Sequence, residues 1–443
     1  MRIFNSKTNK IETFQSIEPN KVSLYLCGPT VYNHAHIGNA RPIVVFDLLR
    51  RVLIASGYEV KYVSNYTDID DRIIEKALDE MKTEKEIAER YIGAYEWVRH
   101  NLHADQVDET PRVTEVIDEI IEFISLLIEK GFAYEVEGDV YFKVDQIKTY
   151  GQISHQKLDA LRVGARIEEN ASKANPLDFV LWKKTDDAGI KWDSPWGKGR
   201  PGWHTECVVM IHDSFGSNID IHAGGQDLKF PHHENESAQN YAMHDHDLAN
   251  YWVHNAMLQI DGEKMSKSLG NVIWAKDYIE RFGSNVTRWL LLSTHYRLIL
   301  NISEDTINQA LKEIERIEAV VKQVSIELEL NGILDNNVDM VLFESFLKPL
   351  QDDLNVANAQ VVLFETIKQL NQALRTKDKD YSRLSVLLNT FEKMLDILGI
   401  EVKRMTLSDE DKALFSNWDQ AKKSKDFETA DTIRKTLQEK GYL

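Results

Sequence analysis

The segment between residues 22 and 64 constrains the fold more than any other part of this sequence. Residues 22–27 form a short apolar run that suits a buried strand and ends at Gly28. Apolar residues then recur at helical spacings over 41–56, Gly57 stands where a helix would end, and 60–64 supply a second strand. A strand, crossover helix and strand imply a parallel pair, so we predict an open α/β sheet whose ligands bind beyond the carboxyl ends of its strands.

The spacing of apolar residues divides the rest of the chain into a mixed middle part and a helical C-terminal part. The middle holds short strand patterns and a Lys/Asp-rich connection, and the sheet resumes near 218–222. After residue 303 the apolar spacing is helical, with Ile307, Leu311, Ile314, Ile317, Val321 and Val324 on one face, and 341–375 and 381–398 follow the same pattern. We predict a Rossmann-like α/β domain split between 1–120 and 200–260, a connective insertion at 121–199, a loop region at 261–304, an α-helical bundle at 305–400 and a small helical module at 401–443.

Composition narrows the class of protein. With 43% hydrophobic and 28% charged residues, the 443-residue chain has the composition of a soluble globular protein. A formal net charge of −18 argues against nonspecific coating of nucleic acid, but is compatible with a local basic surface. The first residues lack the apolar core of a signal peptide, and no run is long enough to span a bilayer, so we expect a cytoplasmic protein without a membrane partner.

A histidine-containing loop follows the first predicted strand. His34, His36 and Gly38 precede the crossover helix. Imidazole N–H groups and the free amides of a helix N-terminus stabilise anionic oxygen, and a glycine lets backbone approach a nucleotide. We interpret the loop as a phosphate site; the alternative is a loop whose histidines are merely solvated.

A second candidate phosphate site is the pentapeptide Lys-Met-Ser-Lys-Ser at 264–268. Two lysines three residues apart with interleaved serines can surround a phosphate with charge and hydroxyl donors. Gly262 and Gly270 flank the segment and would let it close over ATP. The alternative is an ordinary polar surface loop.

Four residues form a candidate metal site. His232 and Glu236 are spaced i, i+4 on a helix expected to begin after Pro231, and the chain's two cysteines, Cys27 and Cys207, could add thiolates. A Cys₂-His-Glu set suits Zn²⁺. Spacing leaves His233 open as an alternative ligand, and two lone cysteines are also compatible with small buried side chains.

Taken together, these segments resemble the class I aminoacyl-tRNA synthetases. Residues 36–39 (His-Ile-Gly-Asn) are similar to the HIGH signature of that class, and residues 264–268 match its KMSKS signature letter for letter. The segments around Cys27, at 202–207 and at 223–236 resemble the cysteinyl-tRNA synthetases in particular. The resemblance extends strongly to about residue 305 and more loosely through the helical tail.

The resemblance implies a role for each residue of these motifs. The zinc ligands would be Cys27, Cys207, His232 and Glu236. The cysteine pocket would be lined by Gly28, Thr67 and Trp203. ATP would contact His34, His36, Gly38, Asn39, Gly225, Asp227, Lys264, Ser266 and Lys267. The catalytic residues would be His36, Lys264 and Lys267. Asn39 stands where many class I enzymes have a second histidine, and its amide can still donate to phosphate.

The implied activity is that of a cysteine–tRNA ligase. It would use ATP with Mg²⁺ to convert L-cysteine into cysteinyl-adenylate, release pyrophosphate and transfer the cysteinyl group to tRNA(Cys). One zinc ion per chain would bind the substrate thiol; a hydroxyl is a poorer zinc ligand, so we expect rejection of serine without an editing domain. We expect a monomer, with 261–304 forming the KMSKS loop and stem-contact region, 305–400 contacting tRNA, and 401–443 forming a shortened anticodon-binding module.

Two other functions compete with this one. A paralogous cysteine ligase of mycothiol biosynthesis would keep the zinc pocket but transfer cysteine to an amino-sugar, and such ligases lack the anticodon module that residues 422–434 resemble. A catalytically silent paralogue would keep zinc as a binding module. Intact His36, Lys264 and Lys267 favour a working enzyme over that second alternative.

Overall fold

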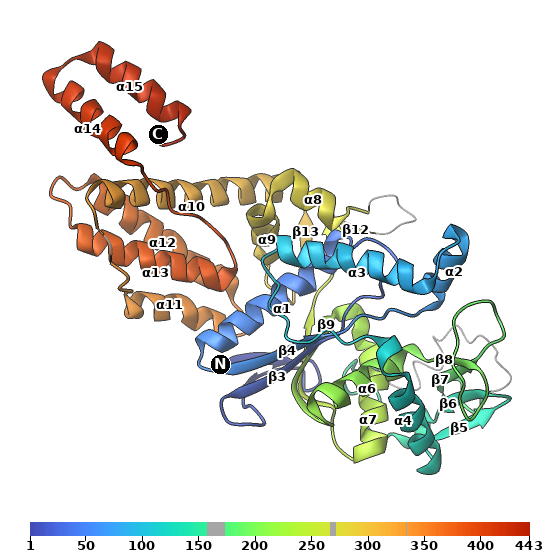
Figure 1. The fold of residues 1–443 in the computed structure, drawn as a ribbon. Helices are drawn as coiled ribbons and strands as arrows, with labels where there is room; N and C mark the ends of the chain where they lie inside the picture. The colour runs from blue at the N-terminus through green and yellow to red at the C-terminus, as the bar shows by residue number, and fades with distance from the viewer. Residues whose placement is uncertain (157–172, 266–271, 334) are drawn as a thin grey trace.

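A parallel sheet lies at the centre of the molecule. The computed structural model describes residues 1–156, 173–265, 272–333 and 335–443. The four strands of the sheet lie in the spatial order β10-β9-β3-β4, all parallel. Their bounds are Lys21–Leu26 (β3), Glu59–Ser64 (β4), Ile219–Gly225 (β9) and Ala249–Asn255 (β10). The predicted α/β class and the first crossover, through α1 (Ile37–Ala55), are therefore confirmed (Figure 1).

Helices cover both faces of this sheet because alternate strand residues point to opposite sides. Leu24 and Leu26 belong to a core shared with α1, whereas Tyr25 belongs to a second core shared with α6 and α7. The bounds of these two helices are Trp203–Phe215 (α6) and His232–His244 (α7). Figure 1 shows α1 on one side of the strands and α6 and α7 on the other. Helices α2 (Asp71–Glu80) and α3 (Glu84–Asn101) contribute to the core on the α1 side.

The segment between β4 and α6 adds a second, antiparallel sheet. Helix α4 (Ile117–Glu129) leads into strands in the order β5-β6-β7-β8. The strands are Ala133–Val136 (β5), Asp139–Phe142 (β6), Phe179–Lys184 (β7) and Gly199–Pro201 (β8). The short strand patterns expected in this part of the chain correspond to β5 and β6. Strand β7 pairs with β6, and β8 in turn pairs with β7.

A third small sheet joins the central sheet to the helical half. Its order is β12-β11-β13, with β11 at Leu258–Ile260, β12 at Glu263–Lys264 and β13 at Leu300–Ile302. Helices α8 (Ala275–Phe282) and α9 (Ser284–Leu292) lie between β12 and β13 in the chain. A separate hairpin at the N-terminus pairs β1 (Arg2–Asn5) with β2 (Lys10–Thr13).

The C-terminal part is helical, as the spacing predicts. Its bundle contains Glu304–Leu330 (α10), Met340–Leu350 (α11), Val356–Arg375 (α12) and Tyr381–Leu398 (α13). The helical pattern over 341–375 is interrupted at 351–355, where Asp353 and Leu354 adopt positive φ. On α10, Leu311 departs from the predicted face: it is 37% exposed, while the neighbouring Ala310 is 2% exposed.

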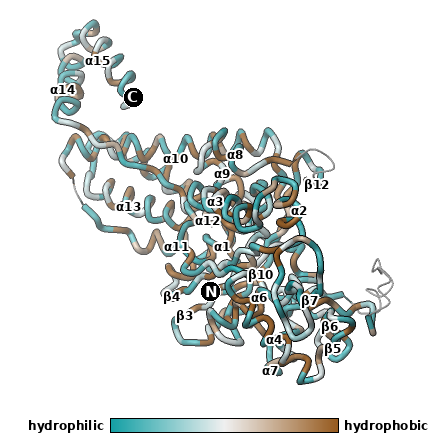
Figure 2. Tube along the Cα trace, turned by 45° about the vertical axis from the view of Figure 1, so that its right-hand side comes forward, coloured by the Kyte–Doolittle hydropathy of each residue, from teal (hydrophilic) through white to brown (hydrophobic). Residues whose placement is uncertain are grey.

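The last two helices project from the body as a hairpin. Helices α14 (Asp409–Ser424) and α15 (Phe427–Glu439) follow a connection that runs along the bundle (Figure 1). Their small core of Leu407, Phe415 and Leu437 includes Ile326 of α10. In Figure 2 hydrophobic colour is concentrated in the body of the molecule rather than in this hairpin. No described helix is both long and apolar enough to cross a membrane.

Candidate functional site

Four side chains from three elements meet beyond the carboxyl end of β3. Cys27 directly follows that strand, Cys207 lies within α6, and His232 and Glu236 lie one turn apart at the start of α7. The two Sγ atoms are 3.5 Å apart, and Cys27 Sγ lies 3.5 Å from Glu236 Oε1. His232 Nε2 lies 3.7 Å from Cys207 Sγ and 2.9 Å from Glu236 Oε1. We call these four residues the thiol cluster.

The thiol cluster is almost fully removed from solvent. Glu236 is 0% exposed and Cys207 and His232 are 2% exposed, whereas Cys27 is partly accessible. One donor atom from each residue lies within 4.8 Å of the other three. Two sulfurs, an imidazole nitrogen and a carboxylate oxygen at such separations have the chemistry and closeness that a single Zn²⁺ requires.

The cluster's groups perturb one another's protonation. Burial raises the pKa of the Cys27 thiol well above its usual range, while the hydrogen bond from Cys27 lowers the pKa of Cys207 to about 6. Burial alone would lower the pKa of His232, but Glu236 and Cys207 raise it to about 10. For Glu236 burial acts in the opposite direction and would raise the pKa, but His222 and His232 hold this pKa well below its usual range. The protonation of each group in the cluster thus depends on its neighbours as well as on burial.

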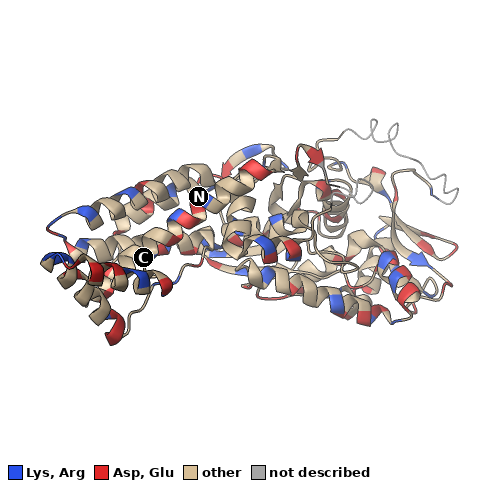
Figure 3. Ribbon diagram, turned by 90° about the horizontal axis from the view of Figure 1, so that it is seen from above, with Lys and Arg blue, Asp and Glu red and all other residues tan. Residues whose placement is uncertain are grey.

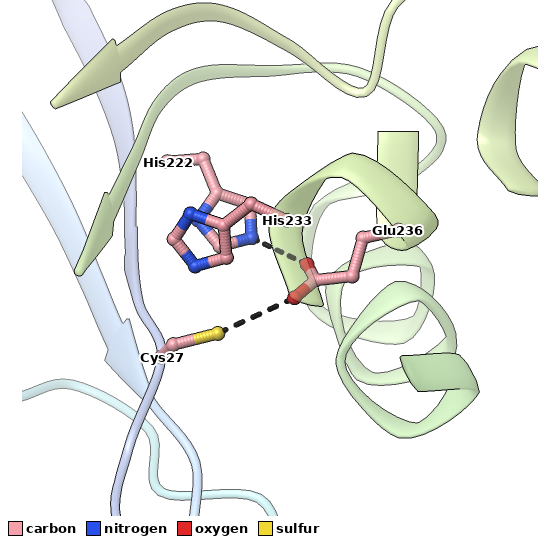
Figure 4. Close-up of side chains that lie close together, drawn as sticks. All are labelled: Cys27, His222, His233 and Glu236. Carbon is pink, nitrogen blue, oxygen red and sulfur yellow. Dashed lines mark hydrogen bonds and ion pairs between the residues drawn. The ribbon is translucent and has the colours of Figure 1, made fainter. Parts of the chain in front are cut away.

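A second set of possible ligands shares two members with the first. Cys27, His222, His233 and Glu236 also bring one donor atom each within 4.8 Å of the others (Figure 4). His222 Nε2 lies 2.6 Å from Glu236 Oε2, the oxygen that does not face Cys27. His233 Nδ1 lies 2.8 Å from His254 Nε2, and its Nε2 is buried with no hydrogen-bond partner in the part of the chain that the structure describes. Because both sets share Cys27 and Glu236, the two sets are alternatives for a single four-coordinate ion.

The residues expected to line an amino-acid pocket surround the thiol cluster. The Trp203 ring, 39% exposed, stacks on His232 with ring centroids 4.2 Å apart. Thr67 Oγ1 donates to Glu206 Oε2 at 3.2 Å, on the helix that carries Cys207. A Cβ at Gly28 would overlap the backbone carbonyl of Asn65, so only glycine fits there.

The histidine loop ends at the first turn of α1. His36 is the N-cap: its Nδ1 accepts from the Asn39 N–H at 3.2 Å, and Asn39 Oδ1 accepts from the His36 N–H at 3.1 Å. The capping box fixes the imidazole at the positive end of the helix dipole. His34 is exposed, and its ring contacts Tyr91 edge-on with centroids 5.2 Å apart.

The two signature segments touch each other. A Cβ added to Gly38 would lie 2.9 Å from the His36 ring and 3.2 Å from Met265 Cε, so both flank this glycine closely. Residues 273–275 pair with 35–37 through the Ile37 N–H to Ile273 O bond of 2.8 Å and the Ala275 N–H to Ala35 O bond of 2.9 Å. We call this junction the signature contact. Lys264 ends β12 beside it, while the predicted Ser266 and Lys267 lie outside the described residues.

The predicted adenosine residues lie at the end of a neighbouring strand. Gly225 is the last residue of β9, which pairs with β3, and the Cys27 N–H donates to Ala223 O at 3.1 Å. Asp227 folds its carboxylate back over Gly225, where a Cβ would meet it. The structure thus places Gly225 and Asp227 at the same edge of the sheet as the thiol cluster.

Some residues of the site carry no local signal in the sequence. His204 Nδ1 lies 3.0 Å from His232 Nδ1, on the ring edge away from the sulfurs, and His222 contacts Glu236. Asn65 Oδ1 accepts from the Gly28 N–H at 2.8 Å. Only the position of His204, one turn before Cys207 on the same helix, could have suggested its proximity. The others come from strands and loops brought together by the sheet.

Comparison with known families and curated proteins identifies close relatives. The family model described as the class I (C) tRNA synthetase catalytic domain matches residues 13–312, and the DALR domain model matches residues 345–403. A Geobacillus sp. (strain WCH70) protein named cysteine–tRNA ligase is 47% identical over 450 residues, which cover 100% of this chain and 97% of that protein. A protein of the same name from Acholeplasma laidlawii (strain PG-8A) is 43% identical over 443 residues, covering 100% of both.

Solved structures show the same fold at low sequence identity. A methionyl-tRNA synthetase of Mycobacterium tuberculosis in complex with methionyl-adenylate superposes with a TM-score of 0.62 at 12% identity, covering 86% of this chain and 89% of that one. A putative arginyl-tRNA synthetase from Campylobacter jejuni superposes with a TM-score of 0.59 at 15% identity, covering 88% and 96%. At these identities the likeness supports the fold alone.

Proposed function

The chain belongs to the cysteine–tRNA ligases of the class I tRNA synthetase family, and we propose that it activates L-cysteine with ATP and transfers it to tRNA(Cys). The cysteine carboxylate attacks the α-phosphorus of ATP and pyrophosphate leaves. A hydroxyl of the 3′-terminal ribose of the tRNA then attacks the carbonyl carbon of the adenylate, and AMP leaves. The observation that carries the proposal is the thiol cluster lying at the same sheet edge as the signature contact.

We propose that the thiol cluster holds one Zn²⁺ through Cys27, Cys207, His232 and Glu236. The donor chemistry and the separations within 4.8 Å fit that ion. When bound, zinc would coordinate the thiol of the substrate and favour its thiolate form, a discrimination against serine that pocket size alone supplies poorly. Trp203, stacked on His232, would wall the pocket, and Thr67 with Gly28 would close its other side.

The cluster with two cysteines is favoured over the histidine-rich alternative. It supplies two thiolates, the ligands that Zn²⁺ holds most firmly in proteins, where the alternative supplies one. Its histidine has its second nitrogen 3.0 Å from His204, the kind of outer contact that orients a ligand ring. His222, 2.6 Å from Glu236 Oε2, would then orient the carboxylate rather than bind the ion.

We propose that the ATP phosphates bind at the signature contact. His36, fixed by its capping box with Asn39, and the N-terminus of α1 would stabilise the α-phosphate as it is attacked, with His34 and Gly38 lining the approach. Lys264 and Lys267, helped by Ser266, would neutralise the departing pyrophosphate, and Mg²⁺ would accompany ATP. Gly225 and Asp227 would take the adenosine, the carboxylate accepting from ribose hydroxyls.

Recognition of tRNA is proposed for the helical half. Figure 3 shows positive and negative residues interspersed along the helices near the C-terminus, so binding would rely on local sites rather than on one basic surface. On α14 and α15, Trp418, Lys422, Phe427 and Arg434 help to line a cavity of about 420 Å³. Lys422 Nζ lies 3.8 Å from the Trp418 ring centroid and Phe427 is 69% exposed, a pairing suited to unstacked bases such as those of an anticodon.

The proposed function assigns a role to each part of the chain. The catalytic domain would comprise 1–120 and 200–260 with the insertion at 121–199. Residues 261–304 would form the KMSKS and stem-contact region, 305–400 the tRNA-contacting bundle and 401–443 the anticodon module. The enzyme would act in the cytoplasm as a monomer.

The test is ATP–pyrophosphate exchange on protein of known zinc content, with cysteine and with serine as substrates. We expect exchange with cysteine alone, lost when zinc is removed and restored when it is returned. Charging of tRNA(Cys), compared with transfer to an amino-sugar, then identifies the acceptor. Absence of exchange in zinc-replete protein would overturn the proposal and favour a silent paralogue.

A further inference from the structure

Arg41 is a buried cation that the proposed chemistry does not use. It lies on α1, five residues after His36, and is 1% exposed. Its Nη1 donates to Ala256 O at 2.7 Å and to Met257 O at 2.9 Å. Its Nη2 donates to Leu298 O at 2.8 Å and to His295 O at 3.3 Å. One guanidinium thus joins α1 to two other chain segments.

Both segments lead directly into the small sheet that carries Lys264. Residues 256–257 immediately precede β11, and 295–298 precede β13, which pairs with β11 in parallel. Strand β12, which ends at Lys264, is held by its antiparallel pairing with β11. Within this hairpin Lys264 pairs with Gln259, two residues after Met257, so the guanidinium fixes the backbone at the base of the hairpin, close to Lys264.

Residues on the C-terminal side of β12 also contact α1 and the loop before it. Residues 273–275 pair with 35–37, and Met265 Cε lies close to Gly38. The His36 segment thus pairs with residues 273–275 at the signature contact, and Arg41 joins the next turn of α1 to the base of the hairpin.

The geometry at Arg41 requires an arginine. Among the described residues, the hydrogen-bond partners of this guanidinium are carbonyl oxygens alone. Burial lowers the pKa of Arg41 to about 10, so the group stays charged near neutrality. A planar fork with several fixed donors can serve four carbonyls at once, whereas a lysine ammonium has three donors on one atom and cannot span them.

We propose that Arg41 is a positioning residue for adenylate formation, which sets the place of Lys264 relative to His36 by clamping the base of the β11–β12 hairpin to α1. This inference rests on the proposed function. Displacement of a charge-stabilising group by about 1 Å can cost about 100-fold in rate, so a clamp of this kind acts on kcat rather than on cysteine binding.

The chain supplies a matched control in Arg288. It is 0% exposed, and it too donates to carbonyls of separate segments, with Nε 2.6 Å from Leu398 O and Nη1 2.6 Å from Leu102 O. Its Nη2 pairs with Asp47. Arg288 joins α9 to α1 and to the end of α13, and among the described residues its hydrogen-bond partners lie outside the hairpin and its base.

The experiment compares Arg41→Lys, Arg41→Met and Arg288→Lys with the wild-type chain. We measure kcat and KM for ATP and cysteine in pyrophosphate exchange, zinc content, the thermal midpoint, and amide hydrogen exchange of peptides covering 256–265. Arg41→Lys should lower kcat about 10- to 100-fold while KM for cysteine and zinc content stay within about twofold. It should also speed amide exchange in 256–265. Arg288→Lys should lower the thermal midpoint without either change.

Three results would decide against the clamp or against the enzyme separately. Equal losses of kcat in Arg41→Lys and Arg288→Lys, at matched stability, would reduce Arg41 to a general structural role. Unchanged kcat and unchanged amide exchange in both Arg41 variants would show that Arg41 has no positioning role. If wild-type protein shows no exchange, the proposed function fails, and amide exchange at 256–265 still decides whether Arg41 holds the hairpin.

Discussion

The thiol cluster and the signature contact lie on one sheet edge but are built differently. In the cluster, side chains from a strand end and two long helices meet at nearly full burial. At the signature contact, a helix cap pairs with residues 273–275, and His34 beside it is exposed. A buried set preserves the spacing that chooses a substrate, whereas an open set admits a large, highly charged nucleotide. Substitutions in the thiol cluster should therefore impair the selection of cysteine, and substitutions at the signature contact should lower the rate of adenylate formation.

The largest expected effect is at the cluster. Cys207→Ser should abolish stoichiometric zinc and lower cysteine-dependent exchange by more than about 100-fold, since even residues behind a ligand typically cost about 10- to 100-fold. Metal analysis and exchange assays measure both. Met210→Leu, at a 0% exposed position on the same helix, should preserve them. Full zinc with full exchange in Cys207→Ser would remove the metal from substrate selection.

The next effect tests the contact. Lys264→Ala should lower kcat of exchange by about 100-fold, the loss typical of one charge-stabilising donor, with zinc content and KM for cysteine unchanged. Lys276→Ala, a lysine of α8 that is exposed and pairs with Glu280, is the matched control and should behave as wild type. A rise in KM for cysteine in Lys264→Ala would break the division between selection and rate.

A smaller effect separates the two possible ligand sets. If His222 only orients Glu236, His222→Gln should weaken zinc affinity by about 10-fold without abolishing binding. Competition with a chelator measures it. The histidine-rich set predicts the reverse order, with His222→Gln losing the metal and Cys207→Ser keeping it.

The free energy of unfolding should depend on the contact between α7 and the turn at 151–154. The Glu234 carboxylate, 2% exposed, accepts from the backbone N–H groups of Gly151, Ile153 and Ser154 at 2.7, 3.1 and 2.9 Å. Glu234→Gln should lower the free energy of unfolding by about 1–3 kcal/mol, since one carboxylate oxygen is replaced by a donor that faces donors. Denaturant titration tests this against Asp213→Asn, an exposed position on α6 that should be neutral.

The smallest effect is confined to the C-terminal hairpin. Lys440, Ser408 and Tyr442 hold the pKa of Asp411 well below its usual range. A depressed carboxyl pKa contributes stability above the unfolded value of about 4, and this contribution is lost as pH falls through the folded value. The Trp418 indole NMR signal, assigned with Trp418→Phe, should therefore broaden or shift in acid below about pH 4. Asp411→Asn should flatten that response and Asp409→Asn should not.

Much of the fold was predictable because its signals are local. The strand from residue 22, the crossover helix and the helix after Pro231 all appear where the periodicity places them. The missed features depend on neighbours. Strand β7 is recognised by its pairing with β6, and the break at 351–355 is made by Asp353, whose carboxylate accepts from the Phe4 N–H at 2.9 Å and from Tyr296 at 2.6 Å.

The amino-acid sequence is enough to show which kinds of chemistry are present: two signature segments, two cysteines, and a histidine and glutamate one turn apart. It is enough because residue type and i, i+4 spacing are local properties. The packing of the folded chain brings the two sulfurs to 3.5 Å, places His222 beside Glu236 and His204 beside His232, and joins Arg41 of α1 to the base of the β11–β12 hairpin. Those contacts join strands and helices distant in the chain, and their closeness is a property of the packed sheet that no local pattern encodes.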